Sequence, residues 1–98
     1  MDDPDDPLVT EDKVPSYDLV EQKIREIDST IIVYRIFYLF NSYIYRFQLI
    51  KKDKMCVLEI PRVLLENIGK DGSEAENELF TLLSQKIDDS ECWKEFQR

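Results

Sequence analysis

The stretch "TIIVYRIFYLFNSYIYRFQLIKK", residues 30–52, decides the fold of this chain. It holds seven of the eleven aromatic residues and many β-branched ones, a composition that is typical of strands. Asn41-Ser42 interrupts the stretch, and the charged run from Lys51 to Lys54 ends it. Together with the residues that follow, this pattern predicts an antiparallel meander of three strands near 31–40, 43–51 and 55–60.

The second turn of the meander sets which residues share a face of the sheet. If Lys52-Asp53 is that turn, six residues that a core can bury fall on one face. They form the cross-strand pairs Leu49–Cys56, Phe47–Leu58 and Tyr45–Ile60. The opposite face of this hairpin is mixed and half-polar.

Helices are predicted before and after the strands in the sequence. Tyr17, Val20, Ile24 and Ile27 recur at helical spacing, and Ser16 precedes them as an N-cap. Behind the strands, "PRVLLENIG" (61–69) reads as a short helix that begins at a proline and stops at Gly69. A capping box from Ser73 to Glu76 then opens a longer helix. The predicted class is α+β, in the order α-β-β-β-α-α, with the helices on one face of the sheet.

The length of 98 residues predicts one domain with two tails. Residues 1–16 are acidic and proline-rich, so we expect a disordered N-terminal tail. Residues 17–88 form the single α+β domain. Residues 89–98 form a C-terminal tail in which Trp93 and Phe96 either fold back as a short helix or lie loose.

Charge and cysteine usage bear on location. The net charge is −8, yet residues 31–62 carry six bases and two acids, which gives +4 between acidic ends. The N-terminus has no signal-peptide pattern and no window is apolar enough to span a membrane, so we expect no membrane contact. Cys56 and Cys92 form no CxxC motif, and Cys56 reads as a small buried hydrophobe. A reducing, cytoplasmic location is therefore expected.

The inventory of catalytic groups is thin. The chain has no histidine, which excludes triads, histidine bases and most zinc sites. The segment between Gly69 and Gly72 is too short for a phosphate-binding loop, and Trp93 stands where a calcium loop starting at Asp88 needs glycine. We expect no enzyme, no cofactor and no metal site.

The leading functional hypothesis is a protein interface on the second face of the sheet, because the helices can cover only one face. With a two-residue turn at Asn41-Ser42, the second face carries a set of large apolar residues: Val33, Phe37, Leu39, Ile44, Ile50, Met55 and Val57. A patch of this kind usually marks a contact with protein, here a second copy or another chain. Arg35 and Arg46 lie in or around this interface and need acidic or carbonyl partners, which a neighbour's acidic tail can supply. The competing reading is that the last helix, or Trp93 with Phe96, covers this face.

The alternative function is RNA binding through the basic, tyrosine-rich strands, with Lys51, Lys52 and Lys54 at the hairpin tip contacting phosphates. The element order is similar to that of double-stranded-RNA-binding domains. In that family a lysine cluster opens the last helix, whereas residues 73–78 here read "SEAENE". Three glutamates at this place would repel a duplex.

Overall fold

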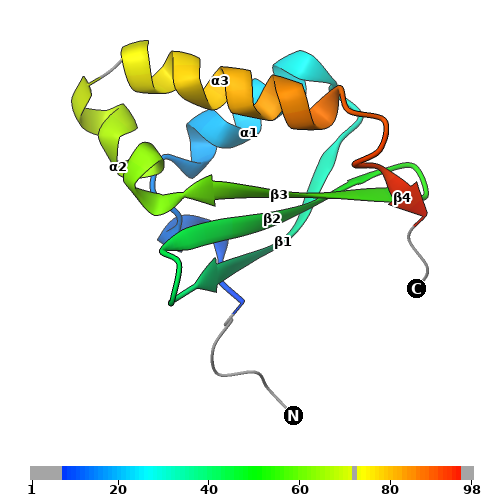
Figure 1. Ribbon diagram of the computed structural model, residues 1–98, viewed down its shortest axis with the longest axis horizontal. Coiled ribbons are helices and arrows are strands. Elements are labelled where there is room, and N and C mark those ends of the chain that lie inside the picture. Colours follow the sequence, from blue (N-terminus) through cyan, green and yellow to red (C-terminus); the bar gives the residue numbers. More distant parts are fainter. Residues whose placement is uncertain (1–7, 72, 96–98) are drawn as a thin grey trace.

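Three helices cover one face of an antiparallel sheet in the computed structural model, which describes residues 8–71 and 73–95 (Figure 1). The main elements are α1 (Tyr17–Ile27), β1 (Ile32–Leu39), β2 (Ile44–Lys51), β3 (Lys54–Pro61), α2 (Arg62–Asp71) and α3 (Ser73–Ile87). A short 3-10 helix, η1 (Glu11–Lys13), precedes them, and a two-residue strand, β4 (Lys94–Glu95), follows. The sheet order is β1-β2-β3-β4. The predicted class, element order and one-sided helix layer are confirmed, and β4 is an addition to them.

The β2–β3 hairpin has the register predicted from Lys52-Asp53. Leu49 lies opposite Cys56, and the next two predicted pairs follow in step. The members of all three pairs face the helices and are buried: Tyr45, Phe47, Leu49, Cys56, Leu58 and Ile60. This hairpin therefore supplies the sheet side of the core, against which the helices pack.

The β1–β2 pairing departs from simple alternation at one point. Leu39 lies opposite Ile44, the pair that a two-residue turn at Asn41-Ser42 would align, although β1 and β2 are joined by four residues, 40–43. A bulge between Val33 and Arg35 then shifts the register by one residue. Because of this shift, Val33 lies opposite Leu49 and packs against the core. The placement of Val33 on the second face of the sheet is therefore wrong.

The helices bury one stripe each, at the three- and four-residue spacing of a half-buried helix. These core residues are Tyr17, Val20 and Ile24 in α1, Leu64, Leu65 and Ile68 in α2, and Ala75, Leu79, Leu83 and Ile87 in α3. None of the helices in the described residues is long and apolar enough to cross a membrane.

The helix boundaries correct two sequence-based expectations. Ser16 does precede α1, but its side chain makes no capping hydrogen bond; its hydroxyl donates instead to the Leu65 carbonyl, 3.0 Å away. This contact ties the start of α1 to α2. Gly69 does not stop α2, which continues to Asp71. The capping box rests on the Ser73 side chain, which lies outside what the structure describes.

Both predicted tails contain packed residues. Before α1, Val14 is buried, and the Val9 N–H donates to the Ile36 carbonyl at 2.8 Å. After α3, Trp93 packs against the core and its indole N–H donates to the Ile87 carbonyl at 2.9 Å. The packed structure thus extends beyond 17–88 at both ends. Residues 1–7 of the predicted N-terminal tail, and Phe96, lie outside the described residues.

Candidate interaction surface

We call the side of the sheet that faces away from the helices the open face (Figure 1). Side chains of a strand alternate between faces, and cross-strand partners share one. The register therefore places four rows across β1, β2 and β3 on the open face: Leu39–Ile44–Pro61, Phe37–Arg46–Glu59, Arg35–Gln48–Val57 and Ile32–Ile50–Met55. Across these three strands the rows at both ends are apolar, and the polar groups lie between them. Lys94 of β4 continues the second end row beyond Met55.

Several side chains of the open face are solvent-exposed to a degree that is unusual for large apolar groups. Ile32 is 62% exposed and Val57 39%. Leu8 is 60% exposed and lies opposite Phe37 through an isolated antiparallel bridge, so the N-terminal segment extends this face past β1. Of the remaining apolar members, Pro61 is exposed and the others are half-buried by their neighbours. Trp93 contacts the core rather than this face, so the competing reading that Trp93 covers the open face has no support in the structure.

The two arginines of the predicted interface have different surroundings. Arg46 faces Glu59 across β2 and β3, and its Nη2 lies 3.1 Å from the Glu59 carboxylate. The acidic partner expected from a neighbouring subunit is therefore present within the same sheet. Arg35 is exposed, with its guanidinium carbon 4.9 Å from the ring centre of Tyr34.

The lysines of the proposed phosphate-binding tip are brought together but are not equivalent. Lys51 turns toward the helix layer, where its Nζ lies 3.2 Å from Asp28 Oδ2 and 4.9 Å from the centre of the Trp93 ring. Hydrogen bonds from the Thr30 hydroxyl and backbone N–H, and then from Lys51, lower the pKa of Asp28 to about 2. Of the three, Lys52 and Lys54 are exposed and Lys51 is half-buried.

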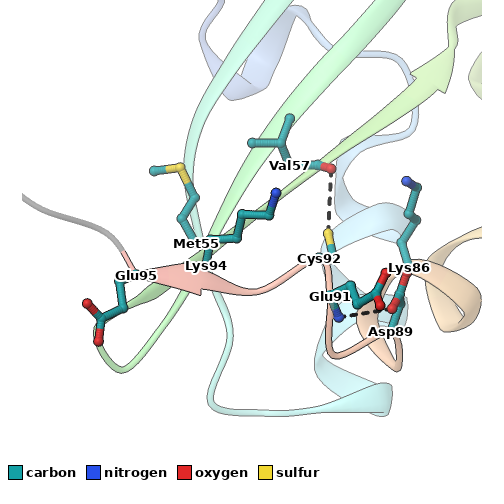
Figure 2. Close-up of a pocket in the computed structure, with 8 residues that line it drawn as sticks. All are labelled: Met55, Val57, Lys86, Asp89, Glu91, Cys92, Lys94 and Glu95. Carbon is teal, nitrogen blue, oxygen red and sulfur yellow. Dashed lines mark hydrogen bonds between the residues drawn. The ribbon is translucent and has the colours of Figure 1, made fainter.

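A groove runs beside β4 at the edge of the sheet (Figure 2). It has a volume of about 570 Å³ and includes Met55 and Val57 of the open face together with Cys92 and Lys94. Cys92 forms a disulfide with Cys56 of β3. Cys56 is fully buried as predicted, but treating it as an unpaired small hydrophobe is wrong.

Other side chains gather at the far end of the sheet, where sequence reasoning proposed no site. The Arg62 guanidinium donates to Glu66 at 2.8 Å and to the Tyr38 hydroxyl at 2.9 Å. These hydrogen bonds, the one to Glu66 first, raise the pKa of Arg62 above its usual range. The i,i+4 spacing of Arg62 and Glu66 was the available sequence signal.

Sequence reasoning placed Phe37, Leu39, Ile44, Ile50, Val57, Arg35 and Arg46 on one face, and the structure brings them together there. It missed Leu8 and Ile32. The bulge that turns Ile32 outward lies in a run of good strand formers without a glycine, so the sequence contains no residue that predicts it. In the part of the chain that the structure describes, no three His, Cys, Asp or Glu side chains gather as metal ligands would.

Comparison of the chain with protein-family models, with curated proteins and with solved structures finds no match, so the functional argument rests on the residues themselves.

Proposed function

We propose that this protein is a non-catalytic interaction module that self-associates through the open face of its sheet. The observation that carries this proposal is the pair of apolar rows across β1, β2 and β3 at the two ends of that face, one of which holds the 62% exposed Ile32. Large exposed apolar groups gathered on one surface are the usual mark of a contact with protein.

A second copy of the chain suits this face better than a charged partner does. Both end rows are apolar, and the central Arg46–Glu59 pair is internally neutralised. Two such faces stacked about a twofold axis therefore place apolar rows on apolar rows, whether the end rows meet their own kind or the opposite end. Where like rows meet, the two Arg46–Glu59 pairs also meet, and each arginine can be shared by two carboxylates. Where opposite ends meet, each pair lies over the Arg35–Gln48–Val57 row of the other copy.

The test compares two matched substitutions in analytical ultracentrifugation. Ile32→Asp puts a charge on the open face, and Val63→Asp puts the same charge on the helix layer at 61% exposure. We expect Ile32→Asp to weaken dimerisation by at least about tenfold, because an unpaired carboxylate must lose its water. Val63→Asp should leave the dimer unchanged. Equal effects of the two variants, or none, would contradict the proposal.

RNA binding is the second candidate function. It is favoured by the exposed Lys52 and Lys54, which lie at the same end of the sheet as the stacked Tyr34 and Arg35, since Ile32 pairs with Ile50 there. Cations beside exposed rings are suited to phosphates and bases. A mobility shift with duplex and single-stranded RNA at low salt tests it. A shift that is lost in a Lys52→Ala/Lys54→Ala variant supports this function, and no shift removes it.

The cytoplasmic location expected from the sequence stays a proposal. Disulfides persist in oxidising compartments and are rare in the cytosol. Alkylating free thiols before cell lysis and weighing the intact chain measures the state of Cys56 and Cys92 in cells. A cytoplasmic protein should carry both as thiols at rest, and a fully formed bridge would contradict that location.

A further inference from the structure

The Cys56–Cys92 disulfide joins the C-terminal segment, residues 88–95, to the edge of the sheet. Cys56 belongs to β3, and the two cysteines are 36 residues apart in sequence. The chain turns back after α3 and adds β4 beside β3 through just two residue pairs, Lys54–Glu95 and Met55–Lys94. A ladder of two pairs contributes little stability by itself.

Besides the two-pair ladder, the non-covalent contacts of this segment centre on Trp93, which packs against the core. The Trp93 indole donates to the Ile87 carbonyl, and Lys51 lies over the Trp93 ring. Lys94 and Glu95 are both exposed. The bridge is thus the strongest single connection between residues 88–95 and β3, and its loss leaves a segment with low local stability.

The two sulfur atoms differ in their access to solvent. Cys56 is fully buried, whereas Cys92 is part-exposed and lines the groove beside β4 (Figure 2). The charged side chains around this groove are Lys86, Lys94, Asp89, Glu91 and Glu95. An incoming thiolate therefore reaches Cys92 first, although the three carboxylates around the groove outnumber its two ammonium groups.

Each sulfur also has a carbonyl oxygen beside it. Cys56 Sγ lies 3.9 Å from the Lys86 carbonyl oxygen, and Cys92 Sγ lies 3.7 Å from that of Val57. A bridged sulfur carries no proton, so these are plain contacts in the disulfide form. After reduction the buried Cys56 thiol can donate to the Lys86 carbonyl, so no buried donor is left without a partner. The Cys92 thiol is part-exposed and can donate to water when its segment leaves β3. Reduction is thus compatible with an intact core.

We propose that Cys56–Cys92 is a reversible redox centre, opened by a dithiol reductant, that controls whether residues 88–95 stay on β3. A thiolate of the reductant attacks Cys92 Sγ, and the S–S electron pair passes to Cys56 Sγ, which takes a proton. The second thiol of the reductant then attacks its own sulfur in the mixed disulfide and releases Cys92 as a thiol. Two electrons and two protons pass from the reductant to the protein, and the reductant becomes a disulfide.

The consequence of opening is a longer free edge on β3. In the disulfide form, β4 occupies the backbone positions beside Lys54 and Met55. Without β4, the edge of β3 from Lys54 onward is available to another strand. This inference does not depend on the self-association proposed above, because it concerns the edge of the sheet rather than its open face.

The test reduces the native protein with millimolar dithiothreitol, without denaturant, and follows hydrogen exchange by mass spectrometry. We expect exchange in residues 88–95 to become at least about tenfold faster while exchange in α1 is unchanged. Emission of Trp93, the single tryptophan, should shift to the red and return on reoxidation. The Cys92→Ser variant should behave like the reduced wild-type protein.

Three results would overturn the proposal. The bridge could resist dithiothreitol until the protein is unfolded, which makes it purely structural. Residues 88–95 could exchange equally slowly in both redox states, which means that packing alone holds them. Exchange in α1 could rise together with that of residues 88–95, which means that reduction unfolds the whole domain.

Discussion

Arg46 and Glu59 face each other across the middle of the open face, with Arg46 Nη2 and Nε at 3.1 and 3.2 Å from one carboxylate oxygen of Glu59. Both side chains are more than a third exposed, so the pair contributes at most about 1 kcal/mol to the stability of the monomer. Its larger role is that Glu59 neutralises the charge of Arg46 within the open face. Among the four rows, this is the only cross-strand pair in which both residues are charged.

Removing Glu59 separates these two roles. The Glu59→Ala variant should unfold in urea within about 1 kcal/mol of the wild-type protein, since the pair is exposed. Its self-association should weaken, because the Arg46 charge then enters the interface without a partner. Urea titration and sedimentation measure the two effects. A variant that dimerises as tightly as the wild-type protein would place Arg46 outside the interface.

The hydrogen bonds to Asp28 predict an acid-dependent contribution to stability. Its pKa is lowered from 3.8 to about 2 in the folded chain, so the contribution is complete above about pH 4. It is lost as the pH falls through about 2, because below that pH Asp28 is protonated in both the folded and the unfolded state. Asp28→Asn should therefore be less stable than the wild-type protein at pH 6, and the two urea midpoints should converge between pH 4 and 2. A constant difference in midpoint would show that Asp28 does not titrate in this range.

Val14 decides where the packed structure begins. It is 5% exposed and lies before α1, in a segment whose composition predicts a tail. Because Val14 is packed in the core, Val14→Ala should cost about 1–2 kcal/mol of unfolding free energy for the lost methyl groups. Leu8→Ala is the control: Leu8 is 60% exposed and should change stability little. Equal and negligible effects of the two substitutions on stability would contradict the packing of Val14 and support the predicted disordered tail over residues 1–16.

Lys52 has a left-handed backbone, with φ of 59°, in the turn between β2 and β3. Asparagine tolerates this conformation better than lysine does. Lys52→Asn should therefore stabilise the chain by about 0.5–1 kcal/mol. The same substitution at Lys54, which lies in a strand, should be neutral or slightly destabilising. Thermal unfolding of both variants checks this; a loss of stability in Lys52→Asn would contradict the strain argument.

The parts of the fold that were predictable are those set by local pattern. The Lys52-Asp53 turn fixes the β2–β3 register, and all three predicted cross-strand pairs are present. Helix spacing likewise identifies the core stripe of α1. The open face follows from these two facts, since helices that pack on one side leave the other side uncovered.

The parts that were not predictable depend on tertiary contacts. The Cys56–Cys92 bridge needs the chain to return to β3 after α3, and no spacing of two cysteines encodes that return. Gly69 stays helical although a glycine there favours a stop, because the adjacent Ile68 packs into the core. Val33 changes face through a bulge in a run of ordinary strand residues.

Self-association through the open face is tested most directly by the molar mass of the wild-type chain, from light scattering behind size exclusion at low and high salt. An apolar interface predicts twice the chain mass of 11.7 kDa in both conditions, since salt does not weaken burial of apolar surface. The Phe37→Asp variant, checked for folding by circular dichroism, should give 11.7 kDa. A wild-type mass of 11.7 kDa at every concentration and in both salts would contradict self-association.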